Sequence, residues 1–350
     1  MATKVDLSSF NLTELEDFVS DELGEASFRA KQIMNWIYKQ GVVDFEEMTN
    51  LSQDLRSRLQ GKAYINKFIE ITRAESKDGT VKFLFKLRDN KEIETVFLPY
   101  QDGRNSICVS TQVGCGMGCN FCATGQQGLE RNLTTGEIIS QILEVQRLMS
   151  SSGYNSSLIT NIVFMGMGEP LANYDNLLKA IKILNSNETL NISMRRITVS
   201  TCGLVPQIKR LADEELQLVL AISLHAAEDE IRDNMMPINK RYPLEELITA
   251  CEYYLERTNR RITFEYALID GVNNRHEDAK KLAQLLSGLL CHVNLIPINP
   301  VKDLRLSRPN REDTKEFKKI LNQNNIQATV RQERGKDIEA ACGQLRTENN

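Results

Sequence analysis

The sequence predicts an α/β protein whose larger part contains a mainly parallel β-sheet. Three observations support this. Six apolar, strand-like runs follow one another from Ser106 onward, and helix-like segments separate them. In addition, 350 residues are enough to bury a large core. Repeated strand and helix units of this kind form either a doubly wound sheet or a full or partial barrel. In both folds, functional residues gather at the carboxyl ends of the strands.

The first hundred residues differ from the rest. Residues 26–40 and 52–60 carry apolar residues at helical spacing, which predicts a small helical N-terminal domain over residues 1–75 and a possible support for RNA. Residues 76–100 contain two β-rich runs, split by the turn-forming RDNK, which predict a β-hairpin linker. A catalytic domain is then expected over residues 101–350.

The expected strands and helices alternate along this larger domain. The strands are 106–111, 161–166, 196–201, 218–225, 262–269 and 292–299. The helices between them are 134–149, 176–186, 244–258 and 276–290. Polar or unusual residues follow five of the strands, at 115–122, 166–169, Ser200, 223–225 and Asn299. Because parallel strands end at the same edge of a sheet, these residues are expected to share one active site.

Composition limits the possible functions. No apolar run is long enough to span a bilayer, and the N-terminus lacks the pattern of a secretory signal, so a cytoplasmic protein without a membrane role is expected. Thiols stay reduced in the cytoplasm. The eight cysteines are therefore better explained as metal-binding, catalytic or buried residues than as a disulfide framework.

Charge gives only a local indication of a nucleic-acid partner. The formal net charge is −4, so the whole chain has no general attraction for a polyanion. Residues 299–337 nevertheless contain ten Lys or Arg against six Asp or Glu. This stretch is either a surface that contacts a phosphate backbone or an ordinary solvated helix face.

Four of the cysteines lie in the short stretch CVSTQVGCGMGCNFC. The last three, Cys115, Cys119 and Cys122, follow C-x3-C-x2-C. Thiolates are soft ligands suited to zinc or to iron–sulfur clusters. Zinc ribbons usually supply two C-x-x-C pairs, and the sequence has no second pair and no histidine nearby. A three-thiolate iron–sulfur cluster with one open iron position fits better.

The string CGMGCNFC resembles the signature of the radical S-adenosylmethionine superfamily, including Phe121 before the last cysteine. The resemblance implies that Cys115, Cys119 and Cys122 hold a [4Fe-4S] cluster and that S-adenosylmethionine binds the fourth iron. It also implies a partial (β/α)6 barrel. The reaction would begin with reductive cleavage of S-adenosylmethionine to a 5′-deoxyadenosyl radical, with an electron from a donor such as flavodoxin or ferredoxin.

The expected cofactor site draws on several strand ends. In FMGMGEP, Gly166 and Gly168 would let the backbone approach a ligand closely, and Glu169 would accept from its ammonium group. A tight turn between strand and helix explains the same residues equally well. Further candidates are the strand-end residues Ser200, Ser223, Leu224, His225 and Asn299. Each alone is more often a satisfied polar group, and their shared placement favours a binding site.

A narrower resemblance covers nearly the whole chain. The chain resembles the RlmN-type dual-specificity RNA adenine C2-methyltransferases in FCATGQQGLERNLTTGEI, FMGMGEPLANYDN, VSTCGLVPQI, ISLHAA, MMPINKRYPL, VNLIPINP and RQERGKDIEAACGQL. The family acts on an adenosine of 23S ribosomal RNA and on the adenosine 3′ of the anticodon in some transfer RNAs. The resemblance therefore implies 23S rRNA and tRNA as partners of this chain.

The same resemblance gives roles to two further cysteines and a glutamate. One S-adenosylmethionine would methylate Cys342, and a second would yield the radical that activates this methyl group, so that two are used per turnover. The methyl carbon would then add to adenine C2, and Glu94 would accept the C2 proton. Attack by Cys108 on the sulfur of Cys342 would release the RNA and leave a transient disulfide. Cys202, Cys251 and Cys291 are expected to be packing residues.

Other interpretations remain open. Glu94 is equally well an outward-facing charge on a strand, and a lone cysteine such as Cys342 is usually a buried small residue. The related C8-methyltransferases, which confer antibiotic resistance, share the cluster and both thiols, although Pro170 and the pair Glu333 and Arg334 resemble the C2 group. A non-catalytic iron–sulfur or zinc protein that binds RNA would not cleave S-adenosylmethionine. A monomer is expected, because no exposed amphipathic seam stands out.

Overall fold

A ten-stranded sheet forms the centre of the computed structural model, which describes residues 4–151, 159–299 and 306–345. Seven parallel strands make up most of it, in the order β6 (Asn105–Cys108), β9 (Asn161–Phe164), β10 (Ile197–Thr201), β11 (Val219–Ser223), β12 (Ile262–Leu268), β13 (Cys291–Pro297) and β14 (Ala328–Val330). Beyond β6, three antiparallel strands extend it: β5 (Glu92–Pro99), β4 (Val81–Lys86) and β3 (Ile69–Glu75).

The strand order confirms the fold class expected from the sequence. All six expected strands are present and parallel to one another, and β3 and β14 form the two edges, so the sheet is open rather than a closed barrel. Strand β14 was not expected, because three residues are too short for an alternating pattern to be recognised. The hairpin expected between residues 76 and 100 is β4 with β5.

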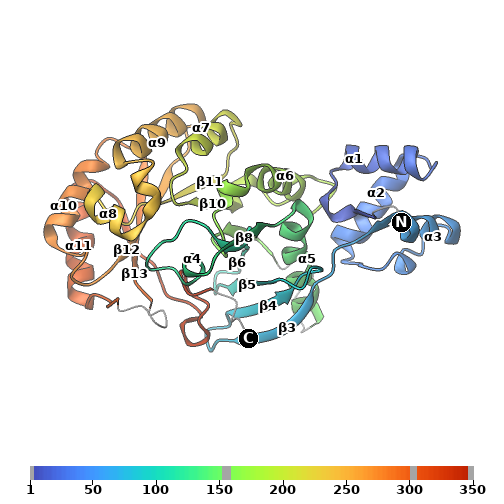
Figure 1. Cartoon of the computed structure of the whole chain (residues 1–350), viewed down its shortest axis with the longest axis horizontal. Coiled ribbons are helices and arrows are strands. Elements are labelled where there is room, and N and C mark those ends of the chain that lie inside the picture. The colour runs from blue at the N-terminus through green and yellow to red at the C-terminus, as the bar shows by residue number, and fades with distance from the viewer. Residues whose placement is uncertain (1–3, 152–158, 300–305, 346–350) are drawn as a thin grey trace.

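Helices pack on the outside of the parallel strands. They are α5 (Thr135–Ser151), α6 (Tyr174–Asn185), α7 (Val205–Asp213), α8 (Asp229–Met235), α9 (Leu244–Thr258), α10 (His276–Leu285) and α11 (Arg311–Gln323). Figure 1 shows α7, α9, α10 and α11 following one another around the outer side of the strands. Among the described residues, no helix combines the length and apolar character that crossing a bilayer requires.

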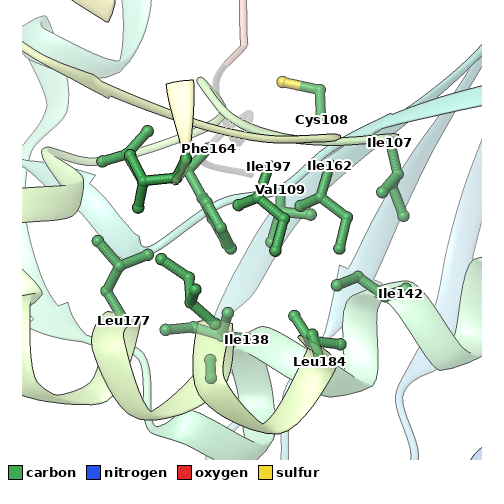
Figure 2. Packing of buried hydrophobic residues seen from close by; sticks show 14 of the residues in the cluster. Ile107, Cys108, Val109, Ile138, Ile142, Ile162, Phe164, Leu177, Leu184 and Ile197 are labelled. Carbon is green, nitrogen blue, oxygen red and sulfur yellow. The ribbon is translucent and has the colours of Figure 1, made fainter. Parts of the chain in front are cut away.

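Strand β6 separates the apolar core from the inner side of the sheet. Ile107 and Val109 point toward α5 and α6, where they meet side chains such as Ile142 and Leu184 (Figure 2). The sulfur of Cys108 points to the opposite side. Alternate residues of a strand face opposite sides, so the positions of Ile107 and Val109 determine that of Cys108. The core on one face therefore holds this thiol toward the other face.

A small helical unit precedes the sheet. It contains α1 (Leu12–Asp17), α2 (Phe28–Met34) and α3 (Gln53–Lys62), and β1 (Val5–Asp6) pairs in parallel with β2 (Ala63–Tyr64). In Figure 1 these helices lie at the far end of the molecule from α10 and α11. The last helix of the part expected over residues 1–75 ends at Lys62. The later residues Ile69–Glu75 form β3, which pairs with β4 and belongs to the sheet.

Candidate active site

The three clustered cysteines lie on a loop supported by a small hairpin. This hairpin consists of β7 (Gln112–Cys115) and β8 (Gly128–Asn132), with the short helix α4 (Ala123–Gln127) before β8. Asn120 N donates to Met235 O of α8 at 3.0 Å, and Ala123 N donates to Gly343 O at 2.7 Å. The loop is thus fixed both to the barrel and to the C-terminal segment that carries Cys342.

A cavity of about 950 Å³ opens where the parallel strands end. Its walls include Cys115, Cys119, Cys122 and Cys342, together with the expected cofactor residues Gly168, Glu169, Ser200, Ser223, His225 and Asn299. Residues far apart in sequence meet here because β9, β10, β11 and β13 run in the same direction. The structure therefore brings together nearly all the strand-end residues that the sequence singled out.

The three clustered thiols affect one another's ionisation. Burial raises the pKa of Cys115 to about 11 and also raises the pKa of Cys119, which Cys122 and Cys115 raise further. Bound iron would stabilise all three thiolates. Within the described residues, no three His, Cys, Asp or Glu side chains are grouped so that they could share a single metal ion. A cubane cluster does not require this, because each thiolate binds a different iron, so the donor set fits a [4Fe-4S] cluster.

Glu169 places a buried carboxylate beside the thiols. Leu171 N donates to Oε1 at 3.0 Å, and Cys202 N donates to Oε2 at 2.8 Å. Burial raises the pKa of Glu169, while these backbone donors lower it. A cationic ammonium group in the cavity would favour the ionised form. The arrangement suits the amino group of an amino-acid cofactor.

His225 and Asn299 offer complementary polar atoms. Nδ1 of His225 accepts a hydrogen bond from Ala267 N at 2.9 Å, which leaves the proton on Nε2. Burial, assisted by Arg232, lowers the pKa of His225 to about 3, so the ring is neutral. Oδ1 of Asn299 is buried without a hydrogen-bond partner among the described residues. Adenine has ring acceptors and an amino donor, which fit an N–H group and an orphaned oxygen.

Gly166 and Gly168 allow a neighbouring segment of the chain to pack closely against their backbone. Gly168 has φ +99°, and a Cβ there would lie 2.5 Å from Cβ of Gln112. At Gly166, a Cβ would lie 2.7 Å from Oγ of Ser110. The expectation that these glycines leave space for a ligand is therefore incomplete, because β7 and the segment before it already fill that space. The motif fixes the cysteine hairpin against β9.

Gly168→Ala is expected to lower the free energy of unfolding by about 3 kcal/mol, through backbone strain and overpacking against Gln112. Denaturant titration measures this loss. Gly288→Ala is the matched control, because Gly288 has φ +83° but open space around its Cα, so only the strain of about 1 kcal/mol applies. Equal losses in the two variants would contradict the packing role of Gly168.

Three expected site residues, Leu224, Glu94 and Cys108, do not line this cavity. The side chain of Leu224 is fully buried, and its carbonyl accepts from Nε of Arg232 at 3.0 Å, so it supports the site from behind. Glu94 is buried on β5, where Nζ of Lys82 lies 2.8 Å from its Oε1. Nζ of Lys82 also donates to Glu339 O at 3.2 Å, which connects this ion pair to the segment before Cys342.

A second, smaller cavity adjoins the first. Cys108 and Cys342 both line it, and Cys342 lines the first cavity as well. Nη1 of Arg331 donates to Sγ of Cys342 at 3.0 Å, and Arg331 also borders both cavities. The sulfur of Cys342 therefore lies between the space that holds the cluster cysteines and the space that holds Cys108.

Sequence reasoning missed Arg331 and the position of Cys202. The basic stretch at 299–337 included Arg331, but nothing distinguished it from the surface lysines around it. Cys202 was expected to be a packing residue, and it does pack in a buried apolar cluster with Met235 and Met236, but it also lines the first cavity with the three motif cysteines. Its place directly after β10, within the string VSTCGL, was the available signal.

Comparison with known proteins explains this arrangement. Residues 5–65 match the ribosomal RNA large subunit methyltransferase N-terminal domain, and residues 109–283 match the radical SAM superfamily. A probable dual-specificity RNA methyltransferase RlmN of Clostridium novyi is 50% identical over 339 residues, which cover 97% of this chain and 96% of that protein. The one from Staphylococcus aureus (strain JH9) is 48% identical over 343 residues, covering 98% and 93%. The chain belongs to the RlmN family.

A solved structure supports the family assignment at the level of the fold. The crystal structure of a radical SAM methyltransferase from Sphaerobacter thermophilus superposes with a TM-score of 0.94 at 48% sequence identity. The match covers 98% of this chain and 100% of that one. The helical unit, the antiparallel strands and the open parallel sheet are therefore features of a radical SAM methyltransferase fold.

Arg331→Gln is expected to slow the alkylation of Cys342 by iodoacetamide about tenfold at neutral pH. Nη1 of Arg331 donates to Sγ of Cys342 at 3.0 Å and holds this sulfur in one position at the cavity wall, and the variant loses that contact. Mass spectrometry of the peptide that contains Cys342 gives the rate. Cys291, the first residue of β13, is the internal control within the same sample. An unchanged rate at Cys342 would show that Arg331 does not activate this sulfur.

Proposed function

We propose that this protein methylates carbon 2 of an adenosine in 23S rRNA and of the adenosine 3′ of the anticodon in some tRNAs, by radical S-adenosylmethionine chemistry. Membership of the RlmN family supports this, since its relatives are named dual-specificity RNA methyltransferases. The position of Cys342 is the observation that carries the proposal. Its sulfur borders one cavity with the cluster cysteines and another with Cys108.

The first cavity is the proposed cofactor site. Cys115, Cys119 and Cys122 would hold a [4Fe-4S] cluster, and Glu169 would accept from the ammonium group of S-adenosylmethionine. His225 and Asn299, with Ser200 and Ser223 nearby, would hold the adenosine part. When bound, these groups supply a methyl group and a carbon radical, using two S-adenosylmethionine molecules per turnover and an electron from a flavodoxin or ferredoxin.

Cys342 is the proposed carrier of the methyl group. Adenine C2 is electron-poor and cannot attack a sulfonium methyl directly, whereas a thiolate can. Arg331 would hold the sulfur of Cys342 by the hydrogen bond from its Nη1 and orient it toward the cofactor. Methylation turns this sulfur into a thioether, which is a weak acceptor, so the interaction with Arg331 weakens and the methyl group becomes available to a base in the second cavity.

Cys108 and Glu94 would complete the reaction. After the adduct has lost one electron and its C2 proton, the thiolate of Cys108 would attack the sulfur of Cys342. The sulfur–sulfur bond forms as the carbon–sulfur bond breaks, the released carbon takes up a proton to become the methyl group, and an external reductant would restore both thiols. Glu94 is the proposed acceptor of the C2 proton; it lies on the same side of the sheet as Cys108, because its strand neighbour two residues on, Val96, pairs with Cys108. We place this chemistry in a cytoplasmic monomer, where thiols are regenerated.

The experiment uses protein reconstituted without oxygen and incubated with S-adenosylmethionine, a reductant and fragments of 23S rRNA. Digestion to nucleosides and mass spectrometry should reveal 2-methyladenosine with the wild-type protein and none with Cys342→Ala. The control Cys251→Ala should still form the product, because Cys251 is buried in α9 and lines neither cavity. Detection of 8-methyladenosine would instead assign the protein to the C8 group. Neither product, with no 5′-deoxyadenosine released, would leave only a structural iron–sulfur or zinc protein.

A further inference from the structure

The second cavity is lined by both of the thiols to which the proposed function gives catalytic roles, Cys108 and Cys342. It shares five wall residues with the first cavity: Met165, Ile296, Asn299, Arg331 and Cys342. Cys108 borders only the second. A base that takes the methyl group from Cys342 must leave room for Cys108 to attack the same sulfur. RNA that approaches through the second cavity would pass Tyr100 and Arg334, which line it.

Tyr100 brings an aromatic ring and two guanidinium groups together at this wall. It directly follows β5, and its side chain is half-buried. The guanidinium carbons of Arg104 and Arg334 each lie 4.9 Å from the centroid of its ring. Proteins that bind single-stranded nucleic acid combine these same features, stacking bases on aromatic rings and pairing phosphates with basic side chains.

The two arginines are held to different extents. Arg334 is 14% exposed, and its Nη2 donates to the carbonyl of Asp78 at 2.7 Å, so it fixes the ring from the protein side. Its buried Nε lies 3.9 Å from Oδ2 of Asp78, which completes an ion pair on the protein side. Arg104 is 59% exposed and pairs with the equally exposed Asp102. Such surface pairs contribute little, so a phosphate can replace Asp102 as the partner of Arg104.

We propose that Tyr100, Arg104 and Arg334 form a binding subsite for the nucleotide next to the target adenosine. The base of that nucleotide replaces the guanidinium of the exposed Arg104 over the ring of Tyr100, and Arg104 turns away from the ring to contact the phosphate. Arg334, held by Asp78, keeps the plane of Tyr100 in position. This subsite rests on the proposed RNA methyltransferase function and extends it, because it holds the RNA strand open beside the extruded adenosine.

The test is fluorescence anisotropy with a labelled 23S rRNA fragment that contains the target adenosine. Tyr100→Ala should raise the Kd about tenfold, because one stacked base is lost, while Tyr100→Phe should bind like the wild type. Arg104→Ala should lower the slope of log Kd against log salt by about one, because one phosphate contact disappears. Thermal melts of each variant check that the fold is retained.

Arg210→Ala is the matched control. Arg210 lies 4.0 Å from the ring centroid of Tyr174 in a similar pair that borders neither cavity, so its loss should leave the Kd unchanged. Wild-type affinity in folded Tyr100→Ala protein would overturn the subsite alone. A wild-type protein that neither binds nor methylates the RNA would overturn the proposed function together with the subsite.

Discussion

Replacing Cys108 with alanine is expected to leave the protein covalently joined to its RNA. In the proposed reaction the carbon linking Cys342 to adenine C2 is released only when another thiol attacks the sulfur of Cys342. Cys108 is placed for this role, because its strand directs it to the inner side of the sheet and into the cavity that Cys342 also borders (Figure 2). Without it, the reaction should stop after one addition.

The protonation state of Cys108 supports the separate roles proposed for Cys108 and Cys342. Burial raises its pKa to about 12, with a further contribution from Cys342, so Cys108 is a neutral thiol at neutral pH. Arg331 donates to the sulfur of Cys342 instead. The first methylation should therefore occur on Cys342. The raised pKa also means that more thiolate forms as pH increases, so release of the RNA should become faster between neutral pH and about pH 9.

A denaturing gel with labelled RNA detects the trapped species as a band that survives denaturation and disappears after protease treatment. Cys251→Ala controls for the loss of a buried thiol elsewhere, since Cys251 is fully buried in α9. Release of 2-methyladenosine by Cys108→Ala protein at the wild-type rate, without a retarded band, would show that another group resolves the adduct.

Replacing Cys119 with alanine is expected to remove the iron–sulfur cluster and all product formation. Cys119 is half-buried between Cys115 and Cys122 in the loop after β7, and these two neighbours are the charges that raise its pKa after burial itself. Two thiolates cannot hold three irons of a cubane. Iron content and the visible absorbance of the reconstituted protein should both fall to background.

The Cys202→Ala variant tests whether a cavity cysteine outside the motif also binds iron. Cys202 is buried and lines the same cavity, but it is not one of the three cysteines of the C-x3-C-x2-C motif. This variant should retain its iron, because the fourth iron position is reserved for a cofactor rather than a protein thiol. Equal loss of iron in Cys202→Ala and Cys119→Ala protein would indicate a closed site with four protein thiolates.

The sequence was most informative where chemistry depends on local spacing. Cys115, Cys119 and Cys122 share one loop, and the six parallel strands were visible as apolar runs, so their meeting at one sheet edge followed from topology. The relation of Arg331 to Cys342 depends on how the segment after β14 folds back over the sheet, which no local pattern reveals. The same holds for the contact between Gly168 and Gln112, which are separated by the cysteine loop and α5.

Glu94 illustrates a different limit. The sequence left open whether Glu94 is an outward-facing charge, and the structure shows that it is buried; its side-chain pairing depends on the neighbouring strand. Lys82 on β4 occupies its carboxylate at 2.8 Å, and Lys82 also contacts Glu339 O near Cys342. Its position relative to the two cavities was therefore set by β4 and by the C-terminal segment together, and not by the residues around Glu94.

The central claim is that Cys342 carries the methyl group from the cofactor cavity to the RNA. The most direct measurement is the mass of the tryptic peptide that contains Cys342, after incubation of the reconstituted protein with S-adenosylmethionine labelled in its methyl group and without RNA. We expect this peptide to gain one labelled methyl group on sulfur, while the peptide that contains Cys108 stays unmodified. Labelled 2-methyladenosine formed by protein whose Cys342 never becomes methylated would contradict the account.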